Sequence, residues 1–204
     1  MSEAISNNRR QRKKEATKSK IIEIAVELFN KQGFEFTTME QIAEQTDIAK
    51  GTLYNYFPTK ELIVGTYIHG VIEGNGPFVD LMINELPDTR SRLYEVLVNM
   101  SRWNEQNREF VEIYLHSRMQ TTYKSRNKPG EQSGFRLNLE KIFRLGQQEG
   151  ELKEDLSIEF LATHFTVMYF TTLIRWLADP ENFELPKELS LLIDFFLNGS
   201  KKQL

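Results

Sequence analysis

The chain contains the stretch Lys50-Gly51-Thr52-Leu53-Tyr54-Asn55-Tyr56-Phe57, which ends directly before Pro58. We expect a short helix over residues 49–57. It should end before Pro58, because a proline disfavours helical backbone at the residue that precedes it. Leu53 and Phe57 are four positions apart and can share the buried face of such a helix. A helix of about two turns offers few other positions to a core, so the remaining side chains are expected to face solvent.

Three features of this region are unusual for a plain helical bundle. Tyr54 and Tyr56 are left toward solvent, where a phenol can hydrogen-bond a phosphate, although one of them can instead be half-buried in the core. Gly51 costs about 1 kcal/mol against alanine in a helix. It is accounted for if another surface approaches the backbone there; the alternative is a tolerated glycine near a helix end. Lys60 lies at the positive start of the next helix, where a bound phosphate would favour it; the alternative is an indifferent surface lysine.

Two helices are expected ahead of this stretch. The first runs from about Glu15 to Gln32 and ends at Gly33, a residue that commonly follows helices. The run Thr37-Thr38-Met39-Glu40 fits a capping box, a threonine with a glutamate three residues on, and starts a short helix with Ile42 and Ala43 facing inward. Two short helices joined by a tight turn match a helix-turn-helix, although periodicity alone cannot separate it from any small helical bundle.

Helical periodicity continues to the end of the chain. Thr59 can cap a helix to about Ile72, and the segment 74–77 with its glycines and proline indicates a break. Further amphipathic segments cover residues 93–103, 110–115, 135–143, 157–178 and 187–198. No segment shows the sustained alternation of a strand. The predicted fold is therefore all-α, with about nine helices in total.

Charge is distributed unevenly along the 204 residues, whose formal net charge is −3. Residues 1–62 carry a net charge of +1, seven of the first twenty residues are basic, and residues 63–204 carry −4. A basic arm ahead of a near-neutral module is typical of a nucleic-acid-binding end joined to an acidic body; the alternative is a merely solvated tail. We expect a disordered basic arm over 1–14, a DNA-binding domain over 15–62 and a second domain over 63–204.

Several classes of protein are disfavoured by composition. The chain has no cysteine, which excludes disulfides and thiolate metal sites. No secretory signal is recognisable, and the most apolar segment, Ile158–Leu177, is interrupted by Glu159, His164 and Arg175, so it predicts a buried helix and a cytoplasmic protein. Three scattered histidines, no phosphate-cradling glycine loop and no nucleophile elbow argue against an enzyme, and no cofactor or metal is expected.

The segment Ile21–Leu62 resembles the N-terminal domain of the TetR (tetracycline-repressor-like) family. The matching positions lie in one ungapped stretch, about a fifth of the chain, and are Ala25, Leu28-Phe29, Gly33-Phe34, Thr37-Thr38, Ile42-Ala43, Lys50 through Phe57 and Lys60-Glu61-Leu62. Asp47 stands where the family usually has glycine, and Ala49 where it often has serine. Aspartate tolerates left-handed backbone and can cap the next helix, so we expect the turn to persist.

The resemblance implies that residues 49–56 form a recognition helix in the major groove of double-stranded DNA. It implies that phosphates are held mainly by Thr38, Thr52, Tyr54, Tyr56 and Lys60. It also implies that base edges are reached by Lys50, Gly51, Thr52 and Asn55. Lysine can donate to guanine and asparagine can pair with adenine.

The resemblance further implies a larger C-terminal helical domain that binds a small-molecule effector and builds a homodimer. An apolar or aromatic effector is expected, with pocket candidates Trp103, Phe110, Tyr114, Met119, Tyr123, His164 and Met168, which can equally be ordinary core. The dimer candidates are Phe165, Tyr169, Leu173, Trp176, Leu189, Leu192, Ile193 and Phe196. The predicted function is thus a ligand-responsive transcriptional repressor that binds a palindromic operator; the alternatives are a non-sensing helical adaptor dimer and, least supported, a helical enzyme.

Overall fold

The structure, a computed structural model, describes residues 2–124 and 134–200, and within these ranges the chain forms ten α-helices. The chain divides into two compact units, the first ending at Ile68 and the second beginning at His69. The predicted all-α fold is confirmed. The division falls inside α4 (Lys60–Gly74), the same helix that contains the domain boundary expected between residues 62 and 63. None of the helices in the described residues is long and apolar enough to span a membrane.

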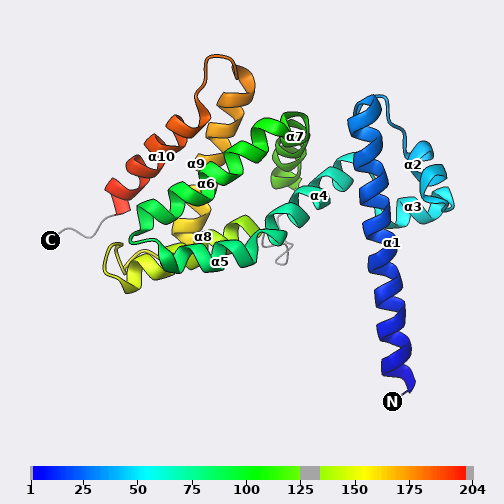
Figure 1. The fold of residues 1–204 in the computed structure, drawn as a ribbon, viewed down its shortest axis with the longest axis horizontal. Helices are drawn as coiled ribbons and strands as arrows, with labels where there is room; N and C mark the ends of the chain where they lie inside the picture. The colour runs from blue at the N-terminus through cyan, green and yellow to red at the C-terminus, as the bar shows by residue number, and fades with distance from the viewer. Residues whose placement is uncertain (1, 125–133, 201–204) are drawn as a thin grey trace. The chain divides into compact units, whose positions relative to one another are not determined.

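The first unit contains α1 (Ser2–Gln32), α2 (Met39–Thr46), α3 (Lys50–Tyr56) and the beginning of α4, and α2 packs against both α1 and α3 (Figure 1). Its core is made by apolar residues that recur at helical spacing on each element. They are Ile21, Ala25 and Phe29 of α1, Ile42 and Ala43 of α2, Leu53 and Phe57 at α3, and Ile63 and Val64 of α4. These buried positions leave the outer face of α3 outside the core.

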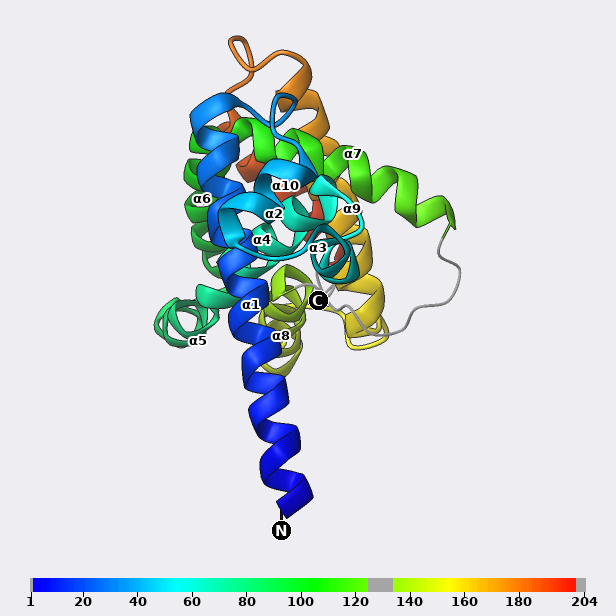
Figure 2. The same ribbon diagram turned by 90° about the vertical axis from the view of Figure 1, so that its right-hand side faces the viewer.

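Helix α1 begins earlier than the sequence indicated. Contrary to the expected disordered arm, residues 2–14 form its first turns, which extend away from α2 and α3 (Figure 2). This segment contains no glycine or proline, and a helix held by packing at its C-terminal half can propagate through polar helix formers without a new nucleus. Gln11 Nε2 donates to Glu15 Oε1 at 3.2 Å one turn later. Gly33, with φ +88°, ends the helix as predicted.

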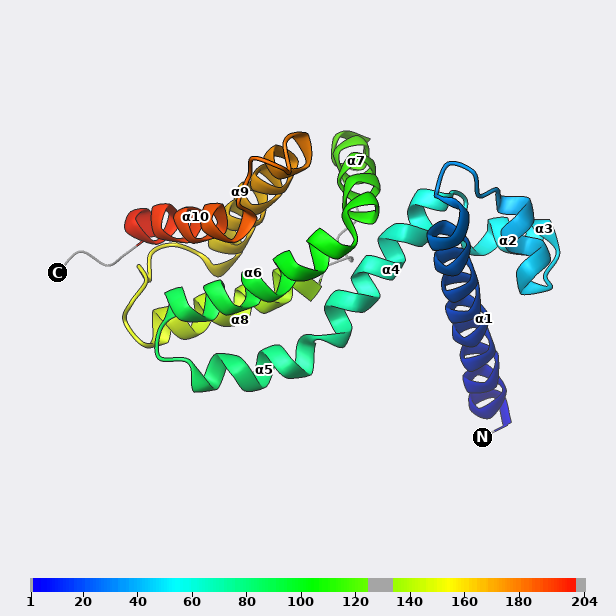
Figure 3. The same ribbon diagram turned by 45° about the horizontal axis from the view of Figure 1, so that its top comes forward.

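The second unit contains the rest of α4 and six further helices. They are α5 (Gly76–Glu85), α6 (Thr89–Gln106), α7 (Arg108–Lys124), α8 (Gly134–Gln148), α9 (Ile158–Ala178) and α10 (Leu185–Ser200). Helices α6 and α9 each contact both α8 and α10, while α5 packs against α8 and α7 against α9 (Figure 3). Ser157 caps α9 as predicted, accepting a hydrogen bond from Phe160 N at 3.1 Å.

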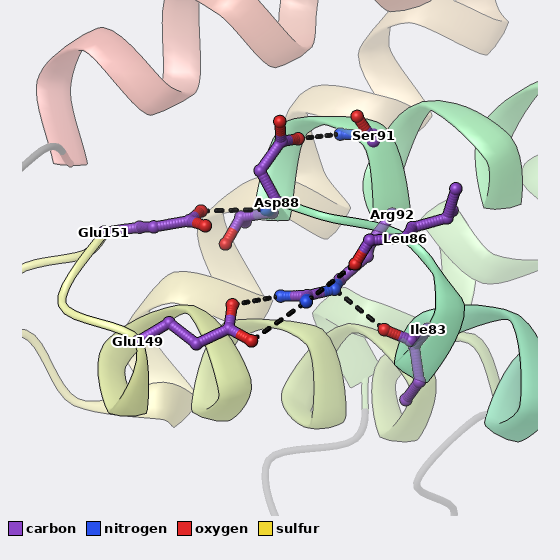
Figure 4. Close-up of polar contacts among 8 residues, drawn as sticks. Ile83, Leu86, Asp88, Ser91, Arg92, Glu149 and Glu151 are labelled. Carbon is purple, nitrogen blue, oxygen red and sulfur yellow. Dashed lines mark hydrogen bonds and ion pairs between the residues drawn. The ribbon is translucent and has the colours of Figure 1, made fainter.

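A buried arginine joins the α5–α6 turn to the end of α8 (Figure 4). Arg92, only 3% exposed, donates to the carbonyls of Ile83 and Leu86 at 2.8 Å each and to both carboxylate oxygens of Glu149 at 2.5 and 3.0 Å. The hydrogen bond from Arg92 lowers the pKa of Glu149. Because a buried guanidinium is favourable only when its donors are satisfied, this network fixes the turn at the end of α8.

Candidate functional site

The short helix α2 begins one residue later than the capping-box pattern predicted. Thr38, not Thr37, is the N-cap: its side chain accepts from Gln41 N at 3.2 Å, and Gln41 Oε1 accepts from Thr38 N at 2.8 Å. Thr37 is buried and donates to the Gly33 carbonyl at 2.8 Å. The predicted box was therefore shifted by one position, because glutamine can replace glutamate in the returning contact. The shift leaves Glu40 free of a capping role.

The turn between α2 and α3 contains a left-handed residue. Asp47 has φ 56° and ψ 47°, the conformation for which aspartate was expected to substitute for glycine. Its side chain does not cap α3, because Ala49 is the N-cap and makes no side-chain hydrogen bond there. Lys20 Nζ of α1 donates to the Thr46 carbonyl at 2.9 Å and holds the end of α2.

Helix α3 places its side chains as its short length predicted. Leu53 and the adjoining Phe57 are buried, whereas Tyr54 is 40% exposed and Tyr56 is half-buried. A Cβ added to Gly51 would have no atom within 4 Å, so nothing inside the described part of the protein requires a glycine at this position.

Thr52 and Asn55 are also exposed on α3, and neither side chain hydrogen-bonds any of the described residues. Together with Lys50, Gly51 and Tyr54 they present one exposed surface, which we call the α3 face. Polar groups on this face are available to an external partner.

Lys50 is held by Glu40, a residue that the sequence had marked only as part of a capping box. Its Nζ forms an ion pair with Glu40 of α2, and both side chains remain more than half exposed. The hydrogen bond between the two side chains is the main cause that lowers the pKa of Glu40 and raises that of Lys50. Lys50 Nζ also lies 5.9 Å from the centre of the Tyr54 ring. The helix pattern alone could not reveal this pair, because ten residues and a turn separate the two side chains.

Lys60 has a partner inside the first unit. Its Nζ donates to the Phe34 carbonyl at 2.6 Å and lies 4.3 Å from the centre of the Phe34 ring. A carbonyl and an aromatic face offset the unfavourable position of a cation at a helix N-terminus. Lys60 therefore ties the start of α4 to the loop after α1, a role that neither of the two sequence-based alternatives included.

The predicted effector residues separate into three groups. Phe110 and Tyr114 of α7 are buried, and Trp103 and Met168 are half-buried. His164 is exposed on α9, and its Nδ1 lies 2.8 Å from the Phe160 carbonyl. The side chains of Met119 and Tyr123 lie outside the described residues.

The structure connects Tyr114 to aromatic residues that were not predicted as effector contacts. A hydrogen bond of 3.0 Å joins its hydroxyl to Nε2 of His69 in α4. Ring contacts continue from Tyr114 to Phe170 at 6.5 Å, from Phe170 to Tyr169 at 6.0 Å, and from Tyr169 to Phe135 at 4.8 Å. We call these five residues the aromatic cluster. His69 could have been noticed as a polar residue in an otherwise apolar part of α4.

Two buried amides lie among the same helices. Asn104 of α6 donates from Nδ2 to the Tyr169 hydroxyl at 2.9 Å, and the burial of Tyr169 raises its pKa. Asn138 of α8 is also buried, with 6% exposure. A separate surface groove of about 850 Å³, lined by Tyr94, Trp176 and Phe183 among others, contains none of the predicted effector residues.

The predicted dimer residues lie in the core of their own unit. All eight are at most 9% exposed, namely Phe165, Tyr169, Leu173, Trp176, Leu189, Leu192, Ile193 and Phe196. Periodicity identifies an apolar face without showing what covers it, and here the predicted face packs within the chain's own core. The exposed apolar residues of the same helices are Phe160, Val167 and Ile174 of α9 and Leu191 and Phe195 of α10, with exposures of 40–74%. Seven-residue spacing on α9 and four-residue spacing on α10 align them as stripes.

Comparison with known proteins identifies both parts of the chain. Residues 21–65 match the family described as bacterial regulatory proteins, tetR family, and residues 84–199 match the C-terminal domain of TetR/AcrR family transcriptional repressors. The fatty acid metabolism regulator protein of Bacillus subtilis is 24% identical over 183 residues, which are 88% of this chain and 93% of that protein. The regulator TcmR of Streptomyces glaucescens is 42% identical over 64 residues, 31% of this chain and 28% of TcmR.

The fold is shared with a solved structure. FadR of Thermus thermophilus, crystallised with lauroyl-CoA, superposes with a TM-score of 0.78 at 20% identity and covers 92% of this chain and 96% of its own. The C-terminal match alone extends over more than half of the 204 residues. The family is not enzymatic, which agrees with the absence of catalytic motifs from the sequence. The chain therefore belongs to the TetR/AcrR family and is a DNA-binding, helix-turn-helix transcriptional repressor.

Proposed function

We propose that this repressor binds a palindromic operator as a homodimer, with the α3 face in the major groove, and leaves it when an effector binds the second unit. The proposed DNA binding is carried by the α3 face itself. Gly51, Thr52 and Asn55 are exposed there, and a Cβ at Gly51 would contact no other atom. A glycine with open space around it lets a groove edge approach the backbone.

The side chains of the first unit divide into two roles in this proposal. Phosphate contacts are assigned to Thr38, Thr52, Tyr54, Tyr56 and Lys60, and base-edge contacts to Lys50, Gly51, Thr52 and Asn55. Lys60 reaches the Phe34 carbonyl through one of the three protons that a lysine ammonium carries, so two others can face a phosphate. Phosphate contacts position the protein and base contacts specify the sequence.

A gel shift with the DNA upstream of the protein's own gene tests this part. We expect retardation that weakens steeply with salt, because phosphate contacts release counterions. Thr52→Val and Asn55→Ala should reduce binding without unfolding the protein, while Glu44→Ala on the exposed side of α2 serves as the matched control. A complete lack of retardation at low salt contradicts the proposed DNA docking and leaves a non-sensing adaptor dimer as the better interpretation.

For the effector we propose a long-chain acyl-CoA, bound with its apolar chain against the aromatic cluster. Two relatives of the same fold support the ligand class: FadR of Thermus thermophilus was crystallised with lauroyl-CoA and FadR of Bacillus subtilis with stearoyl-CoA. The cluster and its neighbours supply apolar side chains, and the buried Asn138 of α8 supplies a polar group. Small-molecule sites are usually lined by apolar side chains with a few polar groups.

A thermal-shift comparison separates this ligand from a simple aromatic one. We expect lauroyl-CoA and stearoyl-CoA to raise Tm and to release operator DNA, and free CoA and resorcinol to do neither. Phe170→Trp should weaken the acyl-CoA response by filling the cluster, whereas Leu137→Trp, at an exposed position of α8, should not. A response to resorcinol alone would favour the aromatic effector, a ligand with which the related-fold protein RolR was crystallised.

For the dimer we propose that the exposed stripes of α9 and α10 meet the same stripes of a second copy. A two-fold interface uses one self-complementary patch, and it matches the symmetry of a palindromic operator. Phe160→Glu with Phe195→Glu should yield monomers in analytical ultracentrifugation, while Leu137→Glu should not. If the double variant stays dimeric, the interface lies elsewhere.

The proposed mechanism is a shift between two states of the dimer. In one state the two α3 helices are one helical turn of DNA apart, roughly 34–36 Å, or a multiple of it. Effector binding favours another spacing, and it can shift the balance only by its difference in affinity for the two states. Tight effector binding that leaves the operator affinity unchanged contradicts this mechanism.

A further inference from the structure

The ion pair between Glu40 and Lys50 joins the first turns of the two helices of the helix-turn-helix. Glu40 is the second residue of α2 and Lys50 the first residue of α3. Their side chains are 54% and 59% exposed, so the pair lies on the surface and borders the α3 face. The sequence pattern gave Glu40 only a capping role, which Gln41 fills instead, and the contacts proposed above do not use it.

Stability of the fold does not account for this pair. Exposed ion pairs usually contribute little to the stability of a fold, because solvent screens both charges. Helices α2 and α3 are already joined by apolar packing, with Ile42, Ala43 and Leu53 buried at 0–5% exposure. Both charged side chains are accessible to a partner that approaches α3.

A carboxylate at this position affects DNA binding in a direction opposite to that of the lysine. It repels phosphates, and while it pairs with Lys50 it reduces the attraction of that lysine to any DNA backbone. The pair therefore weakens sequence-independent binding. At the operator, this loss of binding free energy must be compensated by contacts that other DNA sequences do not offer.

The chemistry of the pair matches one base pair in the major groove. A G·C pair presents the acceptors O6 and N7 of guanine directly beside the N4 amino donor of cytosine. A lysine ammonium in contact with a carboxylate presents a donor beside an acceptor, which is the complementary arrangement. We propose that Glu40 is a specificity-determining residue that reads a G·C pair together with Lys50, with Lys50 donating to guanine and Glu40 accepting from cytosine N4. This rests on the proposed docking of α3 in the major groove.

Selection of binding sites from DNA with randomised half-sites tests the proposal. The full-length wild type, Glu40→Ala, Lys50→Ala and the control Glu44→Ala are compared at the same salt concentration. We expect the wild type and Glu44→Ala to select G·C at one position of each half-site, and Glu40→Ala and Lys50→Ala to lose the preference at that same position. The wild type should prefer G·C over A·T there by about ten-fold or more.

Two further measurements separate base reading from support of the helix. Glu40→Ala should bind random DNA more tightly than the wild type and with a steeper salt dependence, because Lys50 is then free to neutralise a phosphate. Replacing guanine by inosine at the selected position keeps the major-groove groups and removes only the minor-groove amino group, so wild-type binding should persist. Thermal unfolding checks that every variant is folded.

Three outcomes overturn the proposal. Glu40→Ala could select the same half-site with unchanged preference, it could lose operator and random DNA to the same extent, or inosine could abolish binding. If the wild type still selects a palindrome, any of these outcomes refutes the proposed role of Glu40 but not the proposed docking of α3. Failure of the wild type to select any palindrome refutes the proposed docking of α3 and this inference with it.

Discussion

Helix α3 differs from helices α9 and α10 in how well its sequence predicts which of its faces is buried. Each is rich in apolar and aromatic residues at helical spacing. In α3, with seven residues, only one narrow face can be buried, and Leu53 occupies it while Tyr54 faces solvent. In α9, with 21 residues, apolar side chains cover more than one face, and the face predicted for the dimer interface is buried within the chain's own core. Short amphipathic helices leave few arrangements, whereas long apolar helices leave several.

The sharpest test of this contrast compares two residues two positions apart on α9. Phe165 is 0% exposed and contacts the rings of Phe143 and Phe196 at 5.7 and 5.0 Å, whereas Val167 is 59% exposed. Phe165→Ala should lower the free energy of unfolding by about 3–5 kcal/mol, because it removes a large buried side chain and leaves a cavity. Denaturant titration at constant protein concentration measures the loss.

Val167→Ala is the control and should change the dissociation constant of the dimer more than the stability of the subunit. If Phe165→Ala instead dissociated the dimer and left the folded subunit as stable as the wild type, the placement of Phe165 in the core would be wrong.

The corresponding test on α3 compares adjacent residues. Leu53→Ala should cost about 2–5 kcal/mol of unfolding free energy, since Leu53 is 0% exposed. Tyr54→Ala, at an exposed position, should stay within about 0.5 kcal/mol of the wild type and yet weaken operator binding. Chemical denaturation and a gel shift on the same preparations give both quantities. A stability loss for Tyr54→Ala equal to that for Leu53→Ala would remove the distinction between the two faces of α3.

The ion pair of the buried Arg92 with Glu149 should also affect stability, but less than the loss of a buried apolar side chain does. Arg92 lowers the pKa of Glu149 below its ordinary value of 4.5, so the folded state favours the charged carboxylate. This stabilisation is complete above pH 4.5 and is lost as the pH falls below it, through the lower pKa of the folded state. Thermal unfolding across this range should show a decline that Glu149→Gln reduces. A wild type and a variant with parallel pH profiles would show that the Arg92 network does not depend on this charge.

Gly51 should give the smallest change in stability and a change of opposite sign. A Cβ at this position meets nothing within 4 Å, and alanine is favoured over glycine in a helix by up to about 1 kcal/mol. Gly51→Ala should therefore raise Tm slightly while it weakens operator binding. An unchanged operator affinity would indicate that no groove edge approaches the backbone there.

Local patterns predicted much of the first unit because few residues determine each feature. Gly33 ended α1, Asp47 adopted the left-handed turn, and Leu53 and Phe57 turned inward as expected. The capping box was shifted by one residue because Thr37 and Thr38 satisfy the same pattern, and only the burial of Thr37 distinguishes them. Contacts between elements could not be predicted in this way, and Lys60 on the Phe34 carbonyl and Lys50 on Glu40 are the examples.

The sequence by itself determined the helical class, several helix ends such as those at Gly33 and Ser157, and the helix-turn-helix, because propensity, capping and spacing act over one or two turns. Only the tertiary structure decided which apolar face of α9 and α10 is core, which groups join His69 to Tyr114, and that Glu40 is the partner of Lys50. The physical reason is range. A face becomes core or interface, and a charge becomes paired or free, according to what lies against it, and residues far apart in the chain determine that.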